Sequence, residues 1–207
     1  TDDWRWPNPQ SHPHIAAWRR AIQETGFSGK KFPSSIEALT RRVVGGKGLG
    51  SINPLVDAYN AVSLRHVVPA GGWDLDDLAT GGDELRLLLA TGSERFHAIG
   101  ADEPVGVEPG EAAYVVGDQV VTRHFVWRQS ELGKLTPDTR RVLLVSECLE
   151  AVDDAVCRRV LEDLARPLGE GFGGCSPRPT STRYRSSSPA DPAGGVLLSS
   201  RRPLRPR

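Results

Sequence analysis

Helical periodicity gives way to short β-type runs at Pro69, and this change of pattern constrains the fold more than any other feature of the sequence. Before Pro69, apolar residues recur at helical spacing in three segments, 14–25, 34–44 and 53–66. After it come five short apolar runs separated by glycine, aspartate and proline, which predict strands. A last amphipathic helix is predicted over 152–168. This order of elements indicates an α+β fold rather than a βαβ repeat.

Local signals set the boundaries of these elements. Ser34 and Glu37 have the spacing of a capping box, and Pro54 suits the first turn of a helix. Gly117-Asp118 predicts a hairpin turn between two strands. The five predicted strands are LRLLLA at 85–90, RFHAIG at 95–100, AAYVVG at 112–117, QVVTRHFVW at 119–127 and RVLLVSECL at 141–149.

The composition is that of a soluble globular chain. Of 207 residues, 38% are hydrophobic and 25% are charged, and 26 basic side chains balance 26 acidic ones. No apolar run approaches the roughly 20 residues of a membrane helix. The opening TDDWRWPNPQ lacks the basic start and apolar stretch of a signal peptide. We therefore expect a cytoplasmic protein that does not engage a membrane.

We expect one folded domain over 1–173 and a disordered basic tail over 174–207. The tail has seven arginines against one acid, Asp191, and it is rich in serine and proline. Such a segment has too few apolar residues to offset its ordering entropy. We interpret it as an extension without function. The alternative is a basic arm for RNA phosphates.

Neither a metal nor a cofactor is expected. The three cysteines, Cys148, Cys157 and Cys175, lack the short spacings of a zinc site, and Cys148 is predicted to be a core thiol. GGKGLG at 45–50 follows a helix and lacks the Lys-Ser/Thr ending of a phosphate loop, so it is predicted to be a connector.

Two polar groups are candidates for a binding site. Asn53, Asp57 and Asn60 share one face of a predicted helix, which is either an internally bonded element or the wall of a polar pocket. The run Trp127, Arg128, Gln129 and Ser130 leaves a strand together. It suits a ligand with an apolar part and a carbonyl or phosphate, and the alternative is a solvated strand end.

Two histidines in the predicted strands, His97 and His124, can titrate near neutral pH and could do acid–base work. Because neither has a visible partner in the sequence, a structural role is favoured for each.

SINPLVDAYNAVSLRHVVPAGGWDLDDL at 51–78 resembles the B3/B4 module of the phenylalanyl-tRNA synthetase beta subunit. Further segments are similar to free-standing members of that family: HPHIAAWRRAIQETGF, GSERFHAIG, EPGEAAYVVGD and RHFVWRQSELGKLTPDTRRVLL. Together they cover about residues 12–165. The resemblance implies an α+β three-layer sandwich with mixed sheets and flanking helices, and a proofreading role on tRNA. Members of the family usually carry more chain before His12, so we expect part of the fold to be missing.

The resemblance also implies site residues. Asn60 matches the pocket asparagine of the family, while Pro69-Ala70-Gly71 stands in place of its Pro-Met-His turn. The run from Trp127 to Gln129 falls where the synthetase has Gly-Gly-Glu. A bulky indole and a cation in place of small residues predict an aminoacyl group other than tyrosine, or none.

The leading hypothesis is a trans-acting deacylase that removes a wrong amino acid from mischarged tRNA. Asn60 and Gln129 would orient the ester or water, Arg128 would hold a carbonyl or phosphate, and Trp127 would wall the pocket. His97 is the candidate base, and Asn53 and Ser130 complete the predicted binding set. A second hypothesis is a tRNA- or RNA-binding module without turnover. A third is a small-metabolite enzyme that has kept the fold.

Overall fold

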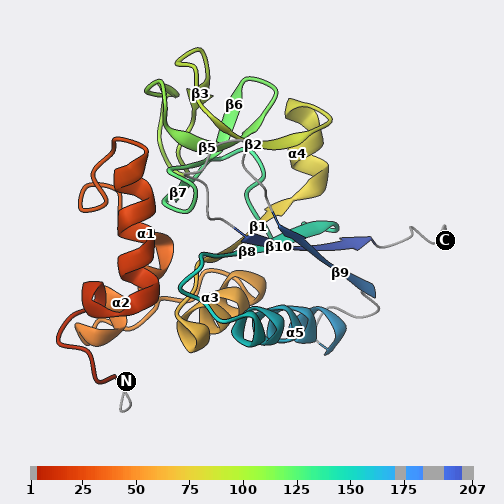
Figure 1. Ribbon diagram of the computed structural model, residues 1–207. Helices are drawn as coiled ribbons and strands as arrows, with labels where there is room; N and C mark the ends of the chain where they lie inside the picture. Colours follow the sequence, from red (N-terminus) through yellow and green to blue (C-terminus); the bar gives the residue numbers. More distant parts are fainter. Residues whose placement is uncertain (1–3, 171–175, 184–193, 202–207) are drawn as a thin grey trace. The chain divides into compact units, whose positions relative to one another are not determined.

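The computed structural model of the chain describes residues 4–170, 176–183 and 194–201, with side chains placed up to Arg166. These ranges contain five α-helices, one short 3-10 helix (η1, Pro9–Ser11) and ten strands (Figure 1). They form two compact units, each built from two separate stretches of chain. The first unit comprises residues 1–50 and 76–134, and the second comprises 51–75 and 135–207. The predicted α+β class is confirmed.

The first unit contains a mixed six-stranded sheet. Its strands are β2 (Leu85–Leu89), β3 (Arg95–Phe96), β4 (Val105–Gly106), β5 (Ala112–Val116), β6 (Gln119–Arg123) and β7 (Arg128–Gln129). The order is β2-β5-β6-β3-β4, and β7 pairs with β6. Only the β3–β6 pairing is parallel among these strands. Every residue of β5 is buried, which explains why its sequence is continuously apolar.

Helices α1 (Pro13–Glu24) and α2 (Ser35–Val44) belong to this unit. Helix α4 (Leu75–Gly81) belongs to it from its second residue onward. α1 and α2 bury their apolar stripes, with Ile15, Trp18 and Ile36 almost inaccessible to solvent. The predicted cap is half formed. Ser34 Oγ accepts a hydrogen bond from Glu37 N at 3.4 Å, but the Glu37 carboxylate binds Arg19 and Arg41 rather than returning to the cap.

The second unit contains a four-stranded antiparallel sheet with the order β1-β8-β10-β9. These strands are β1 (Ala70–Asp74), β8 (Val142–Cys148), β9 (Ser176–Arg183) and β10 (Gly194–Arg201). Helices α3 (Pro54–His66) and α5 (Asp154–Glu170) lie together on one face of this sheet (Figure 1). The core between them includes Leu55, Val62, Leu144 and Leu164.

Two predicted strands are shorter in the structure. The run 95–100 keeps strand geometry only at Arg95–Phe96, and 119–127 ends as a strand at Arg123. The next two residues, His124 and Phe125, have φ angles of 45° and 60°. An extended strand cannot continue through this left-handed backbone, so the chain turns there. Two elements, β1 (Ala70–Asp74) and α4, which begins at the next residue, Leu75, were not predicted from the sequence.

Within residues 174–207, whose disorder stays a prediction, the structure describes two segments as strands. Ser176–Arg183 and Gly194–Arg201 form β9 and β10, and β10 pairs with β8 from Gly194 opposite Cys148 to Ser199 opposite Leu143. One edge of the buried strand β8 pairs with β1, so the backbone N–H and C=O groups on its other edge need a second strand as partner. The composition of the tail does not reveal this requirement. The other tail residues lie outside the described ranges. The single domain over 1–173 stays a prediction.

Candidate functional site

The structure separates the predicted site residues into two groups. His97, Trp127, Arg128, Gln129 and Ser130 lie in the first unit, whereas Asn53 and Asn60 lie in the second. Each group is therefore described within its own unit.

A tight turn after β6 positions the first group. Phe125 N donates to Ala112 O at 2.8 Å, and Val126 N donates to His124 O at 2.7 Å. β7 then returns beside β6, with Arg128 opposite Arg123 and Gln129 opposite Thr122. The run from Trp127 to Ser130 therefore begins in the turn and continues along the short strand β7, which pairs with β6.

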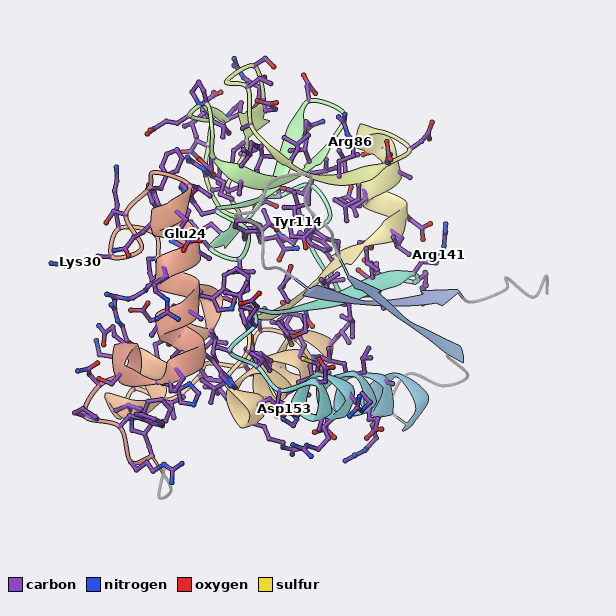
Figure 2. All side chains as sticks on the ribbon, in the orientation of Figure 1. Glu24, Lys30, Arg86, Tyr114, Arg141 and Asp153 are labelled. Carbon is purple, nitrogen blue, oxygen red and sulfur yellow. The ribbon has the colours of Figure 1, made fainter. Side chains whose placement is uncertain are left out.

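The loop after α1 packs against this turn. Phe32 is buried and stacks on the His124 imidazole, with centroids 3.7 Å apart, and it meets Trp127 edge-on at 4.8 Å. Gly29 allows the loop to approach α1, because a Cβ there would lie 2.9 Å from Arg19 O. In Figure 2, the neighbouring Lys30 extends away from this loop.

Two cations lie over these aromatic rings. The Arg128 guanidinium carbon is 4.9 Å from the Trp127 ring centroid, and the Lys31 ammonium is 5.0 Å from that of Phe32. Both cationic residues are exposed, and neither is ion-paired within the part of the chain that the structure describes. We call Lys31, Phe32, Trp127 and Arg128 the aromatic–cation surface. It combines ring faces with positive charge.

A buried ion pair supports this surface from within. Glu111 is fully buried, and its carboxylate accepts hydrogen bonds from Arg123 Nε at 2.8 Å and Nη2 at 2.5 Å. It also accepts one from His124 N at 3.2 Å. Arg123 lies 5.7 Å from the Trp127 centroid, so the pair fixes the indole as well as the turn.

His124 is a structural histidine. It is 1% exposed, and burial, with the nearby Arg123 and Lys31 charges, lowers its pKa to about 3. Its Nε2 is 3.4 Å from Glu111 Oε2 but forms no hydrogen bond. The neutral ring therefore packs as an aromatic side chain, which agrees with the structural role favoured from the sequence.

Gln129 and Ser130 of the first group differ in how far they are exposed to solvent. Ser130 is 1% exposed, and its hydroxyl donates to Leu132 O at 2.8 Å, so it is part of the packing. Gln129 is half-buried, and its backbone carbonyl accepts from Ile99 N at 3.3 Å. Ser130 also pairs with Ala98 in an isolated bridge. This bridge brings the segment of His97 beside β7.

His97 is held in one orientation. Its Nε2 lies 2.7 Å from Ala101 O, and its own carbonyl accepts from Glu131 N at 2.8 Å. The Glu131 carboxylate also accepts hydrogen bonds from Gly100 N and Lys134 Nζ, which lower its pKa. Because a carbonyl oxygen only accepts, Nε2 carries the proton and Nδ1 of the neutral ring keeps its lone pair.

The polar face of α3 is mainly an internally bonded element. Asn53 caps the helix by accepting from Val56 N at 2.9 Å, and its Nδ2 donates to Leu135 O at 3.4 Å. Asp57 accepts from Ile52 N and Ser51 Oγ, which lower the pKa of its carboxyl. Asn60 is half-buried, and its side chain has no hydrogen-bond partner among the described residues.

Lys31 and Phe32 were not predicted as site residues. Their signal is the run Gly29-Lys30-Lys31-Phe32, in which cations adjoin an aromatic residue just after a helix. Sequence spacing cannot place this run beside Trp127, about a hundred positions later in the chain.

Within the described ranges, no cluster of three or more His, Cys, Asp or Glu side chains could hold a metal ion. No helix in the same ranges has the length and apolar character required to cross a membrane.

The elements and their pairings define an α+β protein with one mixed and one antiparallel sheet. Residues 17–162 match the B3/4 domain, and the chain therefore belongs to the B3/4 domain family. The resemblance found in the sequence is confirmed at this level. Membership suggests binding of tRNA or another nucleic acid. No curated protein and no solved structure gives a significant match.

Proposed function

We propose that the protein binds tRNA, and that the aromatic–cation surface contributes to this binding. The observation that carries the proposal is the pair of exposed cations, Lys31 and Arg128, placed over the rings of Phe32 and Trp127. The cations attract the phosphates, and the half-buried Trp127 ring and the exposed Arg128 guanidinium plane stack on unpaired bases. The buried Phe32 ring supports Lys31 and Trp127 from within. Family membership supports the same class of ligand.

Because the net charge of the chain is zero, we expect a few local contacts with tRNA rather than electrostatic attraction over a large surface. Few phosphates are then neutralised, so we expect a shallow dependence of affinity on salt. Ring stacking would supply the rest of the binding free energy, at about 1–3 kcal/mol for each base.

Binding of fluorescent tRNA by the full chain tests the proposal. Arg128→Ala and Lys31→Ala should each weaken binding, and each should reduce the log–log salt slope by about 0.7–0.9 if it removes one phosphate contact. Arg86→Ala is the charge-matched control, since Arg86 is exposed on β2 and donates to Gly117 O (Figure 2). Equal losses in all three variants would contradict a role for this surface.

Hydrolysis of mischarged tRNA is the second candidate function, and the orientation of His97 favours it. With Nε2 donating to Ala101 O, Nδ1 of His97 can accept a proton from a water molecule. That water could then attack the carbonyl carbon of an aminoacyl ester, releasing the amino acid and the free tRNA. Gln129, in the same unit as His97, remains the proposed orienting amide.

A panel of mischarged tRNAs, each incubated with the purified chain, tests deacylation. Release of one amino acid above background, lost in His97→Gln with tRNA affinity retained, would support a general base. Unchanged release in His97→Gln would remove His97 from the mechanism. Background rates for every substrate, with tRNA still bound, would leave the protein a binding module.

A further inference from the structure

Two reduced cysteines, Cys148 and Cys157, belong to the hydrophobic core of the second unit. Cys148 ends β8 and is 6% exposed, and Cys157 lies in the first turns of α5. Cys157 packs against the hydrophobic cluster that contains Cys148. The pair plays no part in the proposed binding site.

The connection between β8 and α5 holds the cysteines in place. Val152 N donates to Leu149 O at 2.8 Å, which closes a turn directly after the strand. Asp153 then caps the N-terminus of α5. Its backbone oxygen accepts a hydrogen bond from Cys157 N at 3.1 Å, and its carboxylate accepts one from Ala155 N at 2.7 Å. Cys157 therefore returns to the strand end through a short, internally bonded segment.

We propose that Cys148 and Cys157 are a redox modification site that forms an intramolecular disulfide on exposure to a peroxide. Their places in one hydrophobic cluster and the short, internally bonded connection between them carry this inference. Disulfide formation would join the end of β8 covalently to the first turns of α5.

The chemistry assigns a different role to each sulfur. Cys157 is half-buried, so it is the thiol that hydrogen peroxide can reach. Its sulfur takes one oxygen to give a sulfenic acid and one water. The Cys148 sulfur then displaces that hydroxyl, which leaves as a second water. Two thiols are oxidised, one peroxide is reduced, and both thiol protons end in water.

The environment of Cys148 suits this second step. Burial, and after it the hydrogen bond with Cys157, raises the pKa of the Cys148 thiol. A thiol with a raised pKa is a poor partner for oxidants in solution. It reacts only with an electrophile held beside it, and the oxidised Cys157 would be such a group.

Cys175 lies outside the described residues, so the test uses the full chain both unchanged and with Cys175→Ser. After peroxide treatment, excess thiol is alkylated in denaturant and the protein is digested without reductant. We expect a peptide pair linked through Cys148 and Cys157, a titre of free thiols lower by two per chain, and full recovery with dithiothreitol.

Two results would overturn the proposal. One is Cys157 oxidised to sulfinic acid while Cys148 remains open to alkylation. The other is disulfide found only between chains or only with Cys175. In Cys157→Ser and Cys148→Ala, each checked for native melting, peroxide should no longer remove two free thiols that dithiothreitol restores, and an unchanged loss of two thiols in either variant is a further result that would refute the assignment.

Discussion

The imidazole of His124 stacks on the phenyl ring of Phe32, with the ring planes 25° from parallel. This contact joins the loop after α1 to the turn after β6, which are far apart in the sequence. Lys31 is bonded to Phe32 in the chain, and Trp127 meets Phe32 edge-on. The aromatic–cation surface therefore depends on a histidine that stays neutral.

Acidification should weaken the fold through this histidine. The pKa of His124 falls from its ordinary 6.5 to about 3 in the native protein. Between these values the unfolded chain binds a proton that the native ring does not, so its contribution to the free energy of unfolding is complete above pH 6.5 and declines towards pH 3. Glu111 is nearby, but Arg123 already neutralises it. Urea unfolding across this window checks the slope, which His124→Phe should reduce. An identical slope in the variant would be evidence against this assignment.

Removing the Glu111 charge should destabilise the protein strongly. Glu111→Gln leaves the Arg123 guanidinium, which is only 13% exposed, without its carboxylate. Loss of one partner of a buried pair costs about 3–5 kcal/mol in the free energy of unfolding. Glu108→Gln is the control at an exposed position, where a change within about 0.5 kcal/mol is expected. Similar unfolding curves for the two variants would refute this account.

Adding a methyl group at Gly29 should displace the loop after α1. The Cβ of Gly29→Ala would lie 2.9 Å from Arg19 O and 3.0 Å from Arg19 Cα, and backbone atoms cannot rotate away. We expect a loss of about 1–3 kcal/mol in stability, together with weaker tRNA binding. Gly50→Ala is the matched control, because a Cβ at that position would meet no atom within 4 Å. Equal melting temperatures for both variants would contradict the close approach.

Asn53 should act as a helix cap rather than a ligand contact. Asn53→Ala removes the acceptor for Val56 N and should cost about 1 kcal/mol of stability, whereas Asn53→Ser should restore most of it. Asn60→Ala removes an amide whose side chain has no hydrogen-bond partner among the described residues, so it should leave stability nearly unchanged. Chemical unfolding of the three variants measures the cap. If Asn53→Ala lowered tRNA affinity at unchanged stability, the predicted binding role would be restored.

Local patterns were enough to predict four of the five α-helices that the structure describes and the long buried strands β5 and β8. α2, α3 and β5 follow directly from a serine cap, an Asn-Pro start and an apolar run. The end of β6 was missed because His124 and Phe125 belong to a β-rich stretch, and contacts from distant residues such as Ala112 and Phe32 hold them in a left-handed turn. Such tertiary constraints override local propensity.

The candidate site was only partly predictable for the same reason. Trp127 and Arg128 form a visible polar–aromatic run, and the Arg128 guanidinium lies over the Trp127 ring. Ser130 belongs to the same run, but its side chain is turned into the fold and bonded to Leu132 O. Lys31 and Phe32 depend on a loop that meets Trp127 from a distant part of the chain.

The alternation of the chain between its two units has a consequence for synthesis. Residues 51–75 leave the ribosome before 76–134, yet they belong to the unit that is completed by β8 and the segments after it. The strand β1 and helix α3 must therefore wait, without the sheet partner β8, while residues 76–134 of the other unit are translated. A nascent chain paused between these stretches would expose the apolar face of α3, which makes the order of translation a point at which chaperones can act.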